Sequence, residues 1–146
     1  MPVVRNPQFY FKEGFCWNNV LNPKTRLLKV KLKQASVNDV GSMSLIPTLN
    51  IVPSKYIIAL LNSNLLFDYY REFINCTVNV QINDIRLMPI IIPTTKVLEK
   101  FISLTNKVIS LKNSKCSHHE RDLNFKEELY SIEMKLDSLV NDLYII

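Results

Sequence analysis

The chain has 146 residues, which suits one domain and leaves little room for a second independent core. Its hydrophobic content of 47% is ordinary for a globular protein and too high for a disordered one. Only two glycines occur, which argues against a glycine-rich phosphate loop. Because apolar stretches are short and no signal peptide is visible, we expect a soluble cytoplasmic protein without a membrane partner.

The net charge is +5, and the basic residues are unevenly distributed. The segment 24–33 contains no acid and five bases: Lys24, Arg26, Lys29, Lys31 and Lys33. Such a segment is typical of a surface that faces a polyanion. Lysines that protect the edge of a β-sheet from aggregation are the alternative, and composition alone does not decide between the two.

The first half of the chain is predicted to consist of strands and loops. Aromatic runs at 9–11 and 15–17 flank a Lys-Glu-Gly turn signal and predict two short strands joined by a tight connection. The alternation over 28–33 predicts a strand with apolar side chains toward a core and its three lysines on the opposite face. A further strand is expected over 42–50, broken at Pro47.

The middle of the chain is predicted to contain one helix and then extended segments. Helical spacing of apolar residues runs to about Phe73, and Ser54 is the expected N-cap. Residues 77–86 alternate between apolar and polar and predict paired strands. The apolar run at 88–92 predicts a short buried strand.

Two helices are predicted after Pro93. Thr94 or Thr95 is expected to cap the first, and apolar residues from Phe125 to Leu143 define the second. The heptad-like spacing favours an antiparallel hairpin, although a single core-facing helix has the same pattern. The predicted fold class is α+β: a small mixed-sheet domain with packed helices over residues 1–93, followed by a long-helix hairpin over residues 94–146 that packs on it.

No catalytic or metal-binding constellation stands out in the sequence. Residues 116–119, Cys-Ser-His-His, form the only cluster of metal-type ligands, and a zinc site there would need a distant Cys16 or Cys76. The three cysteines are widely spaced, which favours free thiols in a reducing compartment. No nucleophile–base pair is recognisable, and the Asn-Pro-Pro-Tyr type of motif used in adenine methylation is absent. We therefore expect no catalytic residue, no metal and no cofactor in this chain.

Several side chains are of the types that bind nucleic acid. The five bases of 24–33 are candidates for phosphate contacts, which supply affinity without sequence information. Amides that could pair with an adenine edge are Asn18, Asn19, Asn79 and Gln81. Trp17 is a candidate for stacking, although an aromatic residue in a short strand is more often part of the core.

Four landmarks along the chain resemble the TaqI-like C-terminal specificity domain of adenine-specific DNA methyltransferases and combined restriction–modification enzymes. The first is Lys-Glu-Gly-x-x-Trp within 11–17, and the second is the leucine-rich segment 56–63 ending in Leu-Leu-Asn-Ser. The third is the stretch 79–90, which resembles the family's Phe-Gln-x-x-Asp-Ile-x-x-Leu-Pro-Ile, and the fourth is the closing helix 132–144. They occur in the family's order. The segment 18–50 matches poorly, and there we expect the variable base-reading loops.

The resemblance implies a target-recognition domain that closes over double-stranded DNA opposite a catalytic domain. That partner, a methyltransferase or endonuclease domain or subunit, would flip out an adenine and methylate it. S-adenosylmethionine and Mg²⁺ are then expected only in the catalytic parts. Two alternatives remain open: an interaction subunit that forms a homodimer through the C-terminal helices, and a zinc-dependent enzyme.

Overall fold

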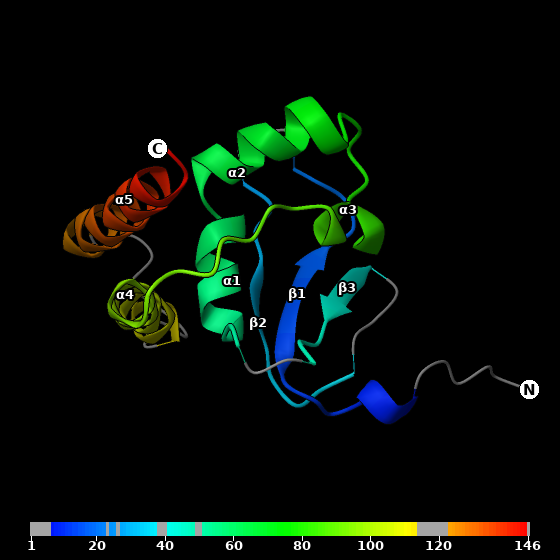
Figure 1. Cartoon of the computed structure of the whole chain (residues 1–146). Helices are drawn as coiled ribbons and strands as arrows, with labels where there is room; N and C mark the ends of the chain where they lie inside the picture. The colour runs from blue at the N-terminus through cyan, green and yellow to red at the C-terminus, as the bar shows by residue number, and fades with distance from the viewer. Residues whose placement is uncertain are drawn as a thin grey trace, which may run out of the picture.

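The structure, a computed structural model, describes residues 7–22, 24–25, 27–37, 41–48, 51–113 and 123–145. These residues form a three-stranded antiparallel sheet with helices packed on it, and two long helices follow (Figure 1). The predicted α+β class is therefore confirmed. In the described ranges, no helix is long and apolar enough to cross a membrane.

Strand β1 (Gly14–Asn18) is the centre of the sheet, between β2 (Lys31–Lys33) and β3 (Ser42–Leu45). Its Phe15 and Trp17 point to one face and belong to the hydrophobic core, because side chains alternate along a strand. A Cβ at Gly14 would collide with the carbonyl oxygen of Leu45. Only glycine therefore allows β3 to approach β1 this closely.

Three of the predicted strands differ from the observed ones. The aromatic run before β1 is no strand: Pro7–Phe9 is a 3₁₀ helix, and Phe11 has a φ of 57°. The strand expected over 28–33 is limited to β2, because Lys29 has a φ of 53°. A left-handed residue interrupts extended backbone in both places. The strand expected over 42–50 ends at Leu45, before Pro47.

The single helix predicted over 54–73 is in fact three shorter pieces. Helix α1 is Ser54–Leu61, helix α2 is Asn64–Tyr69, and a π-helical turn, Tyr70–Ile74, follows α2 directly. The residue at the N-cap of α1 is Pro53, and Ser54 is the first helical residue. The break at 62–63 has a local cause: Ser63 caps α2 by accepting a hydrogen bond from the Leu66 N–H at 3.3 Å.

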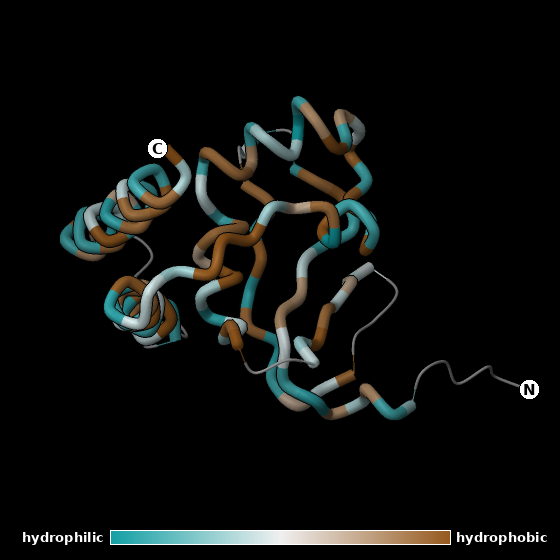
Figure 2. The backbone as a smooth tube through the Cα atoms, in the orientation of Figure 1, coloured by the Kyte–Doolittle hydropathy of each residue, from teal (hydrophilic) through white to brown (hydrophobic). Residues whose placement is uncertain are grey.

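The prediction of strands over 77–92 was wrong. Within the described residues this segment makes one isolated β-bridge, between Asn79 and Val20, and Ile82–Arg86 is a short helix, α3. The Asp84 carboxylate accepts a hydrogen bond from the Gln81 N–H at 2.9 Å and so caps α3. This local bond outweighs the alternating pattern. The apolar residues 88–92 form a connector that crosses in front of α1 and is largely brown in Figure 2.

The connector is tied to the helices by two tyrosine hydroxyl groups. Tyr56 of α1 donates a hydrogen bond to the Ile91 carbonyl at 2.7 Å, and Tyr144 donates to the Pro89 carbonyl at 2.5 Å. An extended segment with no strand partner in the described structure thus has two of its carbonyl groups satisfied by side chains. The apolar run is held between α1 and the last helix, and it does not extend the sheet.

The last two helices form the expected hairpin. Helix α4 is Thr95–Asn113 and helix α5 is Leu123–Tyr144, with Lys112 of α4 paired to Glu133 of α5 at 3.1 Å. Helix α4 packs on α1, where the rings of Tyr56 and Phe101 meet edge to face with centroids 5.0 Å apart. Helix α5 packs on α4 and α2.

The hairpin shares its core with the sheet. Phe101 of α4 and Val140 of α5 are fully buried in the same cluster as Trp17 of β1. The heptad-like spacing is therefore explained by packing within one chain and does not require a second copy. The division into segments 1–93 and 94–146 stays a prediction.

Candidate nucleic-acid interface

The end of β1 brings together amide residues from two distant parts of the chain. Asn18 is the last residue of β1 and pairs with Ser42 of β3. The next residue, Asn19, accepts a hydrogen bond through its backbone carbonyl from the Val80 N–H at 2.9 Å. Asn79 lies in the same small ladder because it bridges to Val20. This group of Asn18, Asn19 and Asn79 is called the amide cluster below.

The side chains of the amide cluster are open. Asn18 and Asn79 are exposed and Asn19 is partly buried, and none of their amide groups hydrogen-bonds to another described residue. Other asparagines nearby serve the fold: Asn22 accepts from the Lys24 N–H at 2.9 Å, and Asn75 accepts from the Thr77 N–H at 2.8 Å. An amide whose donor and acceptor are both free can pair bidentately with an adenine edge.

A partly buried carboxylate, that of Asp84, holds the loop that presents Asn79. Asp84 accepts hydrogen bonds from the Asn75 side chain at 2.7 Å, from the Gln81 N–H at 2.9 Å and from the Tyr70 hydroxyl at 3.4 Å. Asn75 also donates to the Asn79 carbonyl at 2.9 Å. Burial, and then the Asp84 charge, raise the pKa of Tyr70 well above its usual range, so its hydroxyl stays a donor. The loop backbone is therefore fixed before any ligand binds.

Gln81 is less available than the amide cluster. It forms a capping box with Asp84 at the start of α3, which engages its side chain with the helix. The predicted base-reading role of Gln81 is therefore the weaker one. The sequence analysis did not identify Asn75 or Asp84 as residues that shape the site, because Gln-x-x-Asp departs from the usual capping-box pattern of Ser or Thr followed by Glu or Gln.

Three of the five predicted phosphate contacts are accessible lysines on one segment. Lys24, Lys29 and Lys31 are exposed, and none of them has an acidic partner among the described residues. The register that pairs Cys16 with Lys31 brings Lys29 toward the end of β1 that carries Asn18. These three lysines are called the lysine row below.

The backbone of the lysine row is anchored by Asn62, at the end of α1. Its side chain accepts a hydrogen bond from the Val30 N–H at 2.9 Å and donates to the Val30 carbonyl at 2.7 Å. Val30 lies between Lys29 and Lys31. Both lysines therefore leave from a backbone position that is fixed against α1.

Two predicted contacts are not available for DNA. Lys33 is only 4% exposed, and its ammonium donates hydrogen bonds to the carbonyls of Lys12, Gln34 and Ser36 at 2.8, 3.3 and 2.6 Å. The loop after β2 covers this lysine and saturates its three donors. Trp17 is 1% exposed and donates through Nε1 to the Val80 carbonyl at 3.2 Å, so it is a core residue and not a stacking one.

Two other predictions fall outside the structure's described ranges. They are the phosphate contact of Arg26 and the residues 116–119 that were weighed as zinc ligands. In the part of the chain that is described, no group of three or more His, Cys, Asp or Glu side chains could hold a metal ion.

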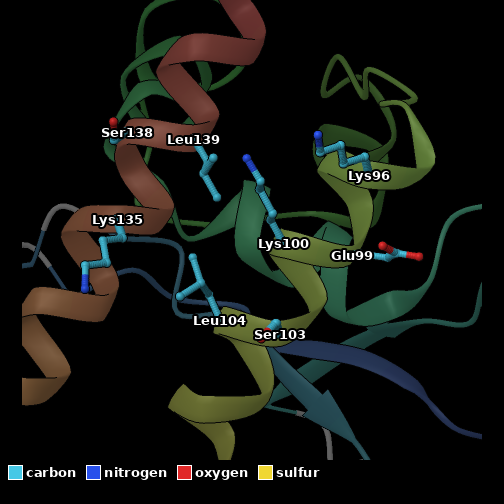
Figure 3. Close-up of a pocket in the computed structure, with 8 residues that line it drawn as sticks. All are labelled: Lys96, Glu99, Lys100, Ser103, Leu104, Lys135, Ser138 and Leu139. Atoms are coloured by element: carbon cyan, nitrogen blue, oxygen red, sulfur yellow. The ribbon is translucent and has the colours of Figure 1, made fainter.

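A second basic surface lies on the hairpin. Helices α4 and α5 alone line a shallow groove of about 650 Å³, with two leucines in the middle and charged or polar side chains around them (Figure 3). The leucines are Leu104 and Leu139, and the surrounding side chains are Lys96, Glu99, Lys100, Ser103, Lys135 and Ser138. Figure 3 shows Lys100 reaching toward Leu139, while Glu99 points away from the groove. This groove combines apolar contact area with positive charge.

Comparison with known proteins adds no assignment. No protein-family model matches this chain, and no curated protein matches its sequence. The resemblance to the TaqI-like specificity domain therefore stays a prediction that rests on the four landmarks alone.

Proposed function

We propose that this chain is a sequence-recognition domain for double-stranded DNA, without catalysis of its own. The observation that carries the proposal is the amide cluster: Asn18, Asn19 and Asn79 come from segments about sixty residues apart and present unpaired amide groups at one end of the sheet. Unpaired amides on a fixed backbone suit base edges, since little conformational entropy is lost on binding.

The lysine row supplies the matching phosphate contacts. Lys29 and Lys31 follow the free edge of β2, and Lys24 lies three residues after Leu21, whose N–H bonds to the Val78 carbonyl beside Asn79. In protein–DNA interfaces, phosphate contacts position the protein and base contacts select the sequence. The lysine row and the amide cluster would supply one kind of contact each. A module of this size contacts DNA over about 600–1,000 Å², so we expect modest affinity alone.

The hairpin groove is the surface that we assign to a catalytic partner. It is lined only by α4 and α5, whereas the amide cluster and the lysine row belong to other segments. A methyltransferase or endonuclease domain seated there would leave the DNA surface free. Such a partner would bring S-adenosylmethionine and Mg²⁺, in keeping with the resemblance.

The test is a fluorescence-anisotropy titration with a randomised duplex pool at about 50 and 200 mM salt, followed by sequencing of the bound fraction. The variant Lys24→Gln/Lys29→Gln/Lys31→Gln should bind more weakly and lose about 2.7 units of the slope of log K against log salt, since each phosphate contact contributes about 0.9. An enriched sequence word in the bound fraction would identify the target.

The matched control is Lys96→Gln/Lys107→Gln/Lys126→Gln, which removes the same charge from exposed helix positions. It should keep the wild-type slope and the same enriched word. Equal losses in both triple variants would show that binding follows net charge alone and would refute this interface.

A further inference from the structure

A cleft lies on the side of the molecule where the lysine row meets the hairpin. Thr25, Leu27 and residues 29–31 line a space of about 670 Å³ together with helix α1, the start of α2 and the two hairpin helices. This volume is in the range of small-molecule sites, about 300–1,000 Å³. The clamp of Asn62 on Val30 fixes one wall, because both residues line the cleft. This wall of the cleft is therefore held against α1 by two hydrogen bonds.

The free charge in the cleft is positive. Lys29 and Lys31 lie on the strand wall and have no acidic partner among the described residues. The opposite wall carries two acids and one lysine, so the cleft lining holds three lysines against two carboxylates; one acid is paired with the lysine of its own wall, and the other is hydrogen-bonded only to neutral groups. Glu133 pairs with Lys112 at 3.1 Å, and Asp137 accepts hydrogen bonds from the Asn64 N–H at 3.0 Å and the Asn64 side chain at 2.5 Å. An anionic group is thus favoured at the strand wall.

The hairpin wall offers a surface for a flat ring. Tyr130 and Met134 lie one helical turn apart on α5, and they are 64% and 49% exposed although both are large and apolar. Val108 of α4 lines the same side, and buried Ile58 and Ala59 of α1 form part of the lining. Aromatic rings stack on tyrosine and make favourable contacts with methionine sulfur.

An unsatisfied hydroxyl in the wall is a second, independent sign of a ligand. Thr105 lines the cleft and is only 3% exposed, and its Oγ1 is the one buried side-chain oxygen or nitrogen in the described structure that has no hydrogen-bond partner. Buried polar groups are nearly always paired. A polar group bound in the cleft would supply the partner after a rotation of the Thr105 side chain.

We propose that this cleft binds a small molecule made of a flat aromatic ring and an anionic group. The anion lies between Lys29 and Lys31, and the ring packs on Tyr130 and Met134. Two sources share this chemistry: a nucleotide, with its base and phosphate, and a non-nucleotide aromatic acid. The site does not rest on the DNA proposal, and its test contains no DNA.

The test measures binding of three probes to the full chain by calorimetry and by amide chemical shifts: AMP, its uncharged counterpart adenosine, and the aromatic anion 8-anilinonaphthalene-1-sulfonate. At least one of the anions should bind with a Kd on the order of 10–100 µM and shift the amides of Val30, Thr105 and Tyr130. If AMP binds, adenosine should bind about tenfold more weakly, because it lacks the charge. AMP binding assigns the nucleotide source, and binding of the sulfonate alone assigns the other.

Three variants and a control make the test specific. Lys29→Gln/Lys31→Gln should weaken anion binding about tenfold, whereas Lys107→Gln/Lys126→Gln, which removes the same charge outside the cleft, should not change it. Val108→Trp should abolish binding by filling the cleft. Val108→Phe fills the cleft in part and leaves Trp17 as the only tryptophan, so the fluorescence of the buried Trp17 shows whether a protein with a large side chain at this position is folded. Binding weaker than about 1 mM for both anions, or binding that Val108→Trp leaves intact in a folded protein, would overturn the proposal.

Discussion

The side-chain amide of Asn62 holds Val30 by both of its backbone groups, accepting from its N–H at 2.9 Å and donating to its carbonyl at 2.7 Å. Asn62 also ends helix α1. Asn62 therefore terminates a helix and also takes the place of a strand partner for Val30. Val30 lies just before β2, next to Lys29, whose positive φ ends the extended backbone there. The shape of the lysine row and of the cleft beside it depends on this pair of residues.

We expect Asn62→Ala to lower the free energy of unfolding by about 1–3 kcal/mol, because it leaves both polar groups of Val30 without a partner at a half-buried site. Asn62→Asp keeps the acceptor but places a carboxylate oxygen against the Val30 carbonyl oxygen, so its loss should be at least as large. Urea unfolding followed by the fluorescence of Trp17 measures both changes. Asn106→Ala, on the exposed face of α4, is the control and should stay within about 0.5 kcal/mol of wild type. A control that loses as much as Asn62→Ala would contradict the clamp.

Lys33 and Lys31 are two residues apart and should respond differently to the same change. Lys33→Met removes three hydrogen bonds from an ammonium group that is almost fully buried. The carbonyls of the covering loop then lack their donor, so we expect a loss of about 1–3 kcal/mol in the free energy of unfolding. Lys31→Met, at an exposed position of β2, should change it by less than about 0.5 kcal/mol. Chemical denaturation measures the free energy of unfolding of the two variants. Equal values would show that the buried ammonium group of Lys33 does not stabilise the fold.

The amide cluster should control DNA selectivity and not the salt dependence of binding. Asn18→Ala and Asn79→Ala each remove a candidate base contact, for which we expect a loss of about 1–3 kcal/mol in discrimination between the preferred duplex and a competitor. The slope of affinity against salt should stay unchanged, since no phosphate contact is lost. Competition titrations on the two duplexes measure this, with Asn106→Ala as the control. A uniform loss of affinity on every duplex would assign these amides to backbone contacts.

Two buried tyrosines should make the protein sensitive to alkali. Tyr56 and Tyr70 are fully buried, and burial raises the pKa of each well above its usual value of about 10, with a further rise at Tyr70 from Asp84. Below about pH 10 both groups are protonated in the folded and the unfolded chain, so they add no pH dependence. Above it the unfolded chain loses protons that the folded chain keeps, and stability falls by up to about 1.4 kcal/mol per pH unit for each tyrosine.

Urea midpoints between about pH 8 and pH 11.5 measure this loss. Tyr70→Phe should make the free energy of unfolding fall less steeply with pH above about pH 10, by up to about 1.4 kcal/mol per pH unit, because phenylalanine cannot ionise. Tyr130→Phe, at an exposed tyrosine, should leave the slope at its wild-type value. If Tyr70→Phe and wild type lose stability in parallel, other groups cause the alkaline transition.

The helical half of the fold was predictable because its signals are long and redundant. Helices α4 and α5 repeat their apolar spacing over 19 and 22 residues, so no single residue decides them. The middle of the chain was mispredicted where one hydrogen bond outweighs the pattern. Ser63 starts a new helix inside an apparently continuous one, and Asp84 starts a helix inside an apparently alternating strand.

For the candidate site, residue types were predictable but their surroundings were not. The alternation of 28–33 places Lys31 and Lys33 on the same face, and nothing in it shows that the loop after β2 buries one of them. Likewise, Asn18 and Asn79 each stood out as amides, but their proximity depends on the bridge between Val20 and Asn79. Such pairings arise from tertiary packing, which local patterns do not encode.

The core joins the two ends of the sequence, and this has a consequence for synthesis. Trp17 bonds to Val80, and its cluster is completed by Phe101 and Val140. At about 5–20 residues per second, a ribosome adds Val140 roughly 6 to 25 seconds after Trp17. During that interval the nascent sheet has two free edges and an uncovered apolar face, the state in which chains aggregate or recruit chaperones. The exposed Lys31 of β2 then protects one edge of the growing sheet before it meets any ligand.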